Sequence, residues 1–324
     1  MREGILAAGN FIVDRVKLID DYPAQDTLAS ILSETPSNGG GPHNILTDLA
    51  RMGVTYPLEA AGMIGDDADG KWILEHCAGH GIATAQLRKS AELPTSYTDV
   101  MTVQATGRRT FFHQRGANAG FTGGQLDFSQ SGARIFHLGY LLLLDYLDTF
   151  SEDGRTQASH LLERASGVGM TTSIDLVSAA HAQFGEIVES SLPHADYLFL
   201  NEIEAGNLLG SVVNAEVSSE LEQAARAIVR KGVRRVVTLH TEKHAVSATV
   251  RGEVYHQESL VLPVEEIAGA NGAGDAFAAG FLHAIHQGLE MPAALSLAVK
   301  IAAQCLRHPT PSGGIETIPS LEAW

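Results

Sequence analysis

The chain has 324 residues, of which 44% are hydrophobic and 19% are charged, so its composition suits a folded protein with a sizeable core and excludes extensive disorder. Its formal net charge is −16 at pH 7, which argues against nucleic acid or an anionic membrane as a partner recognised through the overall charge. Cys77 and Cys305 stand far apart without a CxxC pair, and no apolar run reaches transmembrane length, so we expect a soluble cytoplasmic protein with reduced thiols.

The first third of the chain contains short β-type segments. Residues 4–8 form an apolar run, and apolar and polar residues alternate over 11–18, 96–103 and 110–113. The last two segments flank Thr106-Gly107, which predicts a hairpin turn between them. Between the second and third of these segments, the glycines and proline of PSNGGGPHNILTDLARMG lead into a predicted helix.

From about Arg134 the pattern changes to strands that alternate with helices. The strand-like runs are ARIFHLGYL, TTSIDLV, ADYLFLNE and RRVVTLH, and the helical stretches include TQASHLLERASG and LEQAARAIVRKG. After Asn271 the chain reads as two long helices. Strands buried on both faces and separated by helices predict a parallel sheet with right-handed crossovers. We therefore predict one doubly wound α/β domain over residues 1–324, with a small β element drawn from about 12–36 and 95–115.

The stretch GANGAGD, residues 269–275, follows the strand-like VLPVEEIAG and opens a helix. Backbone N–H groups at a helix start have no partner within the helix, and with the helix dipole they can bind an anion such as a phosphate. Asp275 at this turn has two possible meanings. It can accept a proton from an attacking hydroxyl, or it can simply stabilise the helix dipole. The chain has no GxxxxGK[ST] and no GxGxxG after its first strand, so neither a P-loop nor a Rossmann site is supported.

Together with three further motifs, this turn resembles the signature of the pfkB carbohydrate kinase family, the ribokinase-like sugar kinases. Residues 39–44 read GGGPHN and are similar to the first family signature, and LFLNEIEAG carries the family's NxxE pattern as Asn201 and Glu204. Asp14 follows the first strand in GNFIVD, as is typical of the family. The four motifs occur in the family order and span nearly the whole chain. The resemblance implies a ribokinase-like fold, a mostly parallel sheet flanked by helices with a small β lid over the acceptor.

The resemblance also implies a kinase that uses ATP and Mg²⁺. Asp275 would be the base that deprotonates the acceptor hydroxyl, and the backbone of Gly272, Ala273 and Gly274 would form the anion hole. Asn201 and Glu204 would organise Mg²⁺ and its waters. The acceptor would be bound by Asp14, with Asn10, Gly40, Gly41, Asn44 and Asn118 shaping the same pocket. Asn271, Thr238 and His240 are the further candidates for nucleotide contacts, and a homodimer through the lid is expected.

Several of these residues also have a possible structural role that involves no ligand. Asn44 could cap its helix, Asp14 could be a strand-edge charge, and Glu204 could be an ordinary exposed helix residue. His43, His113 and His137 lack a metal-ligand spacing and are interpreted as packing or hydrogen-bonding residues.

The sequence departs from the family pattern at three places. Gly269-Ala270 stands where the family has Asp-Thr, which weakens the expectation of an activating monovalent cation. His240 follows VTL where a glycine is usual, so contacts to the nucleotide would differ. SIDLVS lacks the Asn and Arg that often follow this strand, and without the Arg a phosphorylated acceptor is disfavoured.

We expect transfer to a hydroxymethyl group of a small sugar. A nucleoside is the alternative acceptor, and a non-catalytic sugar-binding regulator is a third reading. A nucleoside would need aromatic surface for stacking, and aromatic residues make up only 6% of the chain.

Overall fold

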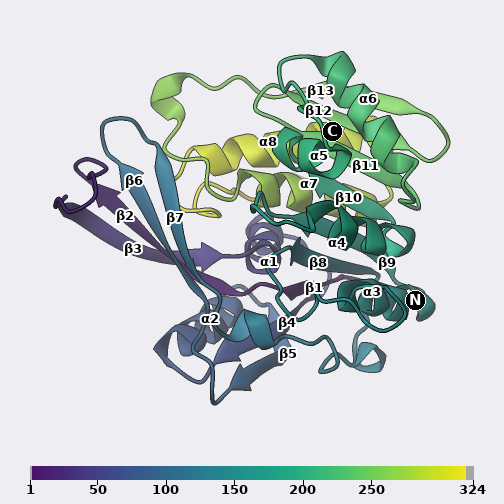
Figure 1. The fold of residues 1–324 in the computed structure, drawn as a ribbon, viewed down its shortest axis with the longest axis horizontal. Helices are drawn as coiled ribbons and strands as arrows, with labels where there is room; N and C mark the ends of the chain where they lie inside the picture. The colour runs from purple at the N-terminus through teal and green to yellow at the C-terminus, as the bar shows by residue number, and fades with distance from the viewer. Residues whose placement is uncertain (1, 319–324) are drawn as a thin grey trace.

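The computed structural model describes residues 2–318 and contains two sheets (Figure 1). The larger sheet has nine strands in the order β13-β12-β11-β10-β9-β8-β1-β4-β5. Its strands are β1 (Ile5–Gly9), β4 (Leu58–Gly65), β5 (Ala83–Ser90), β8 (Ile135–Leu141), β9 (Thr171–Leu176), β10 (Tyr197–Leu200), β11 (Val236–His240), β12 (His244–Thr249) and β13 (Val254–Glu258). The strands from β5 to β11 pair in parallel, and only β12 and β13 are antiparallel.

Helices cover both faces of this sheet, as expected for a doubly wound fold. One face carries α1 (Gly41–Arg51), α2 (Ala68–Gly79), α7 (Ala273–Gln287) and α8 (Met291–Leu306). The other face carries α3 (Gln157–Gly167), α4 (Phe184–Ser191), α5 (Glu202–Leu209) and α6 (Ser218–Val229). Successive residues of β1 face opposite cores, with Ile5 in the first and Leu6 in the second. The apolar run of β1 is therefore buried on both sides, which is why it shows no alternation.

A second, four-stranded sheet projects from the body (Figure 1). It consists of β2 (Ile12–Ile19), β3 (Ile31–Gly39), β6 (Tyr97–Val103) and β7 (Arg109–Gln114), in the order β3-β2-β6-β7. β2 and β6 pair in parallel and the other neighbours are antiparallel. We call this sheet the lid. The β6–β7 turn lies at the predicted Thr106-Gly107.

The short 3₁₀ helices are Gly116–Gly120, Phe128–Gln130, Leu192–His194 and Val264–Glu266. The last of these corrects a prediction, because VLPVEEIAG is not a strand. Its apolar residues Val261 and Val264 are 95% and 83% exposed, and within residues 2–318 the segment pairs with no strand. Pro263 lacks an N–H for a sheet ladder, and β13 already ends the sheet at Glu258.

Among residues 2–318, no helix is long and apolar enough to cross a membrane. The expected homodimer and cytoplasmic location stay predictions.

Candidate functional site

A cavity of about 580 Å³ opens at the carboxyl edge of the large sheet, under the lid. The body contributes Asp175 at the end of β9, Asn201 just after β10 and His240 at the end of β11. The lid contributes Ile12, Asp14, Thr98, Phe111 and His113. Parallel strands that share one sheet present their carboxyl ends along one edge, so segments far apart in sequence meet there. Of the predicted site residues, the cavity is lined by Asp14, Gly40, Asn44, Asn201, Glu204, His240, Asn271, Gly272, Ala273, Gly274 and Asp275.

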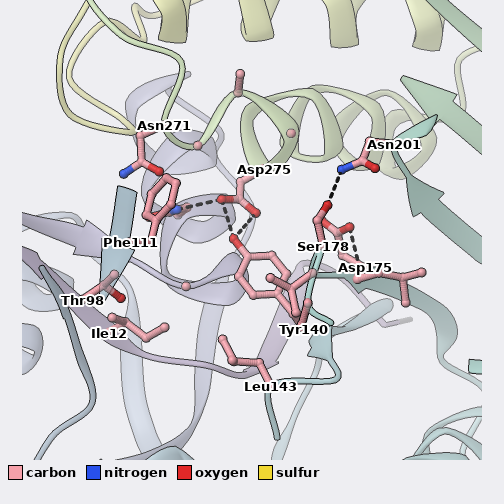
Figure 2. A pocket seen from close by; sticks show the side chains of 18 of the residues that line it. Ile12, Thr98, Phe111, Tyr140, Leu143, Asp175, Ser178, Asn201, Asn271 and Asp275 are labelled. Carbon is pink, nitrogen blue, oxygen red and sulfur yellow. Dashed lines mark hydrogen bonds between the residues drawn. The ribbon is translucent and has the colours of Figure 1, made fainter. Parts of the chain in front are cut away.

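The Asp275 carboxylate lies at the centre of this site, in the first turn of α7 (Figure 2). Its side chain accepts a hydrogen bond of 2.7 Å from the Asn44 amide. It also accepts from the Tyr140 hydroxyl, which lies 2.7 and 2.8 Å from its two oxygens. Figure 2 shows Asp275 between the lid residues Ile12 and Thr98 on one side and Asn201 with Ser178 on the other. The carboxylate is thus held in one orientation by two elements besides its own.

Burial sets the ionisation of Asp275. Removal from water raises its pKa to about 6, against the lowering effect of the hydrogen bonds from Asn44 and Tyr140. A carboxyl group with this pKa is largely ionised at neutral pH but remains basic enough to take up a proton. The simple alternative, a solvated carboxylate at a helix start, does not describe a side chain that is only 4% exposed.

The glycine turn places backbone N–H groups beside this carboxylate, of which the Ala273 N–H donates to the Ala270 carbonyl at 3.4 Å. Gly272 precedes α7 in the left-handed conformation, with φ of 79°, and Ala273, Gly274 and Asp275 form the first turn. The N–H groups of a first turn have no acceptor within the helix, so they can bind an anion. The His240 ring packs against Phe277 of the same helix and lies close to Gly274. Burial lowers the pKa of His240 to about 4, so the ring is neutral.

Asp14 reaches the site from lid strand β2. It accepts a hydrogen bond of 2.9 Å from the side chain of Asn271, which joins the lid to the glycine turn. Burial raises the pKa of Asp14 to about 7, the Asn271 hydrogen bond opposes this shift, and the nearby charge of Asp275 adds to it. Asp14 is therefore a buried carboxyl group on an inner strand of the lid and is not a charge at the edge of a strand.

The raised pKa of Asp14 predicts how the free energy of unfolding depends on pH. Because the folded pKa of Asp14 lies above its unfolded value of 3.8, its contribution is favourable at low pH and is lost as the pH rises through about 7. Asp14→Asn should therefore raise the free energy of unfolding at about pH 8 by on the order of 2–4 kcal/mol, with no gain near pH 4. Denaturant unfolding at both pH values measures this. Asp66→Asn, at an exposed ion pair with Lys89, is the control. A gain that is equal at the two pH values would contradict the assignment.

Asn201 and Glu204 form a capping box at the start of α5. The Asn201 side chain accepts from the Glu204 N–H at 2.9 Å, and the Glu204 carboxylate accepts from the Asn201 N–H at 2.9 Å. Ser178 donates to Glu204 and accepts from the Asn201 amide, each at 2.8 Å. Glu204 is only 4% exposed, so it is not an ordinary surface residue.

Asp175 adds a third carboxylate on the body side of the cavity. Burial raises its pKa well above the usual value, and the charges of Asp275 and Glu204 raise it further. Within residues 2–318, no group of three or more His, Cys, Asp or Glu is arranged to hold a metal ion directly.

Four predicted residues lie outside the cavity lining. Asn10 supports two residues of the lining, because its side chain accepts a hydrogen bond from the Tyr140 N–H at 2.5 Å and donates one to the Leu143 carbonyl. Asn118 hydrogen-bonds the backbone of Phe11 at the base of the lid. Thr238 points into the core, where its hydroxyl pairs with Ser247 at 2.7 Å. At Gly41 a Cβ would lie 2.9 Å from the Tyr140 ring, so this glycine leaves room for that ring.

Sequence reasoning missed Tyr140 and Asp175 as site residues. Both lie at the carboxyl end of a parallel strand, β8 for Tyr140 and β9 for Asp175. Ligands of such sheets bind at this edge, so the ends of the predicted strands pointed to these positions. Selecting these two residues would also have required the strand order and the direction in which each side chain points.

Comparison with known proteins places nearly the whole chain in one family. The model of the pfkB family carbohydrate kinases matches residues 5–318. The chain is 24% identical to a ribokinase of Arabidopsis thaliana over 97% of this chain and 78% of that protein. It is 32% identical to an adenosine kinase of Schizosaccharomyces pombe over 38% of this chain and 37% of that protein, so this match spans just over a third of the relative's length.

Solved structures agree on the fold. The ribokinase of Thermotoga maritima superimposes with a TM-score of 0.78 at 20% identity, over 98% of both chains. The Arabidopsis thaliana ribokinase, solved with ribose and ATP, superimposes with a TM-score of 0.75 at 19% identity, over 98% of this chain and 96% of that one. The predicted ribokinase-like fold is confirmed.

Proposed function

Because the chain belongs to the pfkB family of carbohydrate kinases, whose members are phosphotransferases with an alcohol acceptor, we propose that it transfers the γ-phosphoryl group of ATP to a hydroxymethyl group of a small, uncharged sugar. The observation that carries this proposal is the buried Asp275 carboxylate, which lies in the same helical turn as the backbone N–H groups of the proposed anion hole. A base and an anion site in one turn suit a reaction in which a hydroxyl loses its proton as it meets a phosphoryl group.

Asp275 is the proposed base. The acceptor hydroxyl gives its proton to Asp275, its oxygen forms the new bond to the γ-phosphorus, and ADP leaves with the electrons of the broken phosphorus–oxygen bond. A carboxylate offers about four lone-pair positions, so the hydrogen bonds from Asn44 and Tyr140 leave room for the acceptor hydroxyl. These two residues hold the base in place while it reacts.

The body side of the cavity is the proposed ATP site. The N–H groups of the glycine turn would bind the phosphates, with Asn271 and His240 beside them. Burial raises the pKa values of both Asp175 and Glu204. With Asn201 these two carboxyl groups offer the oxygen atoms that suit a hydrated Mg²⁺. Mg²⁺ supplies charge neutralisation on the phosphates when it is bound. Gly269 and Ala270 offer no carboxylate for a monovalent cation.

Charge favours a neutral acceptor. Among the described residues, the cavity lining contains four carboxylates, Asp14, Asp175, Glu204 and Asp275, and no lysine or arginine. A phosphorylated sugar would meet these carboxylates without a cation to pair with its phosphate. This supports a free sugar, although the relatives also include a ribose-1-phosphate kinase of Halopiger xanaduensis, which is 27% identical over 86% of this chain.

A nucleoside is the second candidate acceptor. Phe111 lines the cavity from the lid although 52% of it is exposed, and the ring of Tyr140 lines it from below. An exposed aromatic ring at a binding site is a surface on which a flat base can stack.

The test is ADP release from Mg-ATP across a panel of free sugars, nucleosides and sugar phosphates, with and without K⁺. We expect a neutral sugar or nucleoside to be phosphorylated, without a requirement for K⁺. Turnover restricted to sugar phosphates would contradict the neutral acceptor. If no compound of the panel causes ADP release although ATP still binds, the non-catalytic regulator would be favoured.

The pH dependence of this activity should reveal the contact between Tyr140 and Asp275. The base must be ionised, so kcat/KM should rise with pH through about 6 and then level off. Tyr140→Phe removes a hydrogen bond that lowers this pKa, so the acid limb should move upward by roughly half to one pH unit. Tyr146→Phe, at a partly exposed position beyond β8, is the control. An unshifted limb would mean that the Tyr140 hydroxyl does not act on the base.

A further inference from the structure

The amide of Asn44, which donates to the proposed base Asp275, is itself hydrogen-bonded to a second asparagine. The Nδ2 atom of Asn38 donates to the Asn44 Oδ1 atom at 2.7 Å and to the Ser312 hydroxyl at 2.8 Å. The Asn44 Nδ2 atom in turn donates to Oδ2 of Asp275 at 2.7 Å. A continuous row of hydrogen bonds therefore leads to the carboxylate. We call its three members, Ser312, Asn38 and Asn44, the amide relay.

The amide relay joins distant parts of the fold. Asn38 lies near the end of lid strand β3, and Asn44 lies in the first turn of α1. Ser312 belongs to the segment that follows α8. The three residues are only 2–5% exposed, so each side chain depends on the others for its hydrogen bonds. Asn38 and Ser312 do not line the cavity, so any effect that they have on a bound substrate passes through Asn44.

Asn38 determines which end of the Asn44 amide faces the base. The oxygen of an amide only accepts and its nitrogen only donates, and a rotation about one bond exchanges the two. If Asn44 turned over, its nitrogen would meet the nitrogen of Asn38, and both would be donors. A single Asn38 nitrogen makes both of its hydrogen bonds, so turning Asn38 over would break them together. Asp275 therefore faces a group that can only donate, which favours its ionised form.

Other ionisable groups also face Asp275 from the elements packed around it. They are Asp14 on β2, Asp48 on α1, Tyr140 on β8, Asp175 on β9 and Cys305 on α8. The charge of Asp275 raises the pKa of each of these groups, so a negative charge on any of them disfavours ionisation of Asp275 in return. The donor-only amide of Asn44 opposes this effect.

We propose that Asn38 is a positioning residue for phosphoryl transfer, which is anchored by Ser312 and holds the nitrogen of the Asn44 amide toward Asp275, so that the base stays ionised and correctly oriented. The inference rests on the proposed function, because it takes Asp275 as the base. Asn38 itself contacts neither substrate.

The experiment removes the donor and follows the ionisation of the base. The proteins are wild type, Asn38→Leu, Asn44→Ala and the double variant. For each, kcat/KM is measured against pH with the acceptor that the wild type phosphorylates best. The carbon-13 NMR signal of the Asp275 carboxyl carbon, identified by its absence from Asp275→Asn, is titrated in parallel, so the pKa of this group is also read without turnover.

The chain offers a matched control and a second variant. Ser37 precedes Asn38 on β3, is 5% exposed, and donates its hydroxyl to the backbone carbonyl of Asn38 at 3.3 Å. Ser37→Ala therefore removes a buried hydroxyl beside the relay and leaves the Asn38 side chain in place. Asn38→Ser has a hydroxyl too short to reach Asn44 and keeps the position polar. It carries the test if thermal unfolding shows that Asn38→Leu is not folded.

We expect Asn38→Leu to raise the pKa of Asp275 by about one pH unit, both in the acid limb of kcat/KM and in the NMR titration. Without the Asn38 donor, the Asn44 amide can turn its oxygen toward a protonated Asp275 and accept from it. The plateau of kcat should fall about tenfold, with the KM for Mg-ATP unchanged. In the Asn44→Ala background the Asn38 substitution should move the pKa by less than about 0.3 units, because the relay is already broken. Ser37→Ala should behave as wild type.

An unshifted pKa of Asp275 in the folded Asn38 variants would overturn the inference, because Asn38 would then have only a structural role. Equal shifts with and without the Asn44 side chain would overturn it as well, since Asn38 would not act through Asn44. Both outcomes leave the proposed function standing. A wild type that phosphorylates no sugar or nucleoside contradicts the proposed function, and the inference fails with it.

Discussion

Asp275→Asn is expected to lower kcat by about 100- to 10,000-fold while both substrates still bind, because the asparagine amide cannot take the proton of the acceptor hydroxyl. Its side-chain oxygen can still accept from Tyr140 or Asn44, so the site should keep its shape. ADP release measures the rate, and calorimetric titration with ATP and with the acceptor measures binding.

A second readout of Asp275→Asn separates loss of the base from loss of the fold. Burial raises the folded pKa of Asp275 above its unfolded value, so the ionised carboxylate destabilises the protein above about pH 6. The variant should therefore be at least as stable as wild type at about pH 8, although it is inactive. Asp66→Asn removes an exposed carboxylate and should change neither property. A rate within tenfold of wild type would show that the proton leaves by another route.

Gly272→Ala is expected to lower kcat by about 100- to 1,000-fold by displacing the N–H groups of the anion hole. The φ angle of 79° at Gly272 costs a residue with a side chain roughly 1–2 kcal/mol. In addition, a Cβ there would lie 2.5 Å from the Cβ and 3.0 Å from the Cα of Pro311. Contacts this short with a backbone atom cannot be relieved by a rotamer change, so the turn itself must move. The affinity for Mg-ATP should fall as well.

The same helix offers a matched control at its other end. Gly288 follows α7 with a φ of 75°, and a Cβ at this position meets nothing within 4 Å. Gly288→Ala should therefore carry the conformational cost alone, about 1 kcal/mol in the free energy of unfolding, with normal kcat. If the two variants lose equal activity, the effect comes from helix stability, and the glycine turn is not an anion site.

Local patterns predicted most of the fold. The shift from alternating segments to apolar runs separated the lid strands from the buried strands, because a sheet with one covered face alternates and a sheet covered on both faces does not. The segment 261–269 is where this reasoning failed, because its apolar residues are exposed in a loop and have no strand to pair with. Composition of a short apolar run does not reveal whether a partner strand exists.

Part of the candidate site was also predicted from short motifs. The glycine turn with Asp275, the Asn201–Glu204 box and Asp14 all line one cavity, and each lies in a stretch whose chemistry is visible locally. Thr238 does not line the cavity, and its hydroxyl pairs with Ser247 instead. Alternate residues of a buried strand face opposite cores, and the sequence of β11 does not say which face meets the ligand.

By itself, then, the sequence determined the alternation of strands and helices, the acidic residue at a glycine-rich helix start and the residue types available for chemistry. Only the tertiary structure decided that Tyr140 donates to Asp275, that Asn271 reaches Asp14 and that Asn38 donates to Asn44. The physical reason is that these contacts join residues on different strands and helices, whose separation depends on strand order and on the position of the lid. Burial then shifts the pKa values of Asp14 and Asp275, and burial is a property of the assembled fold and not of any local stretch.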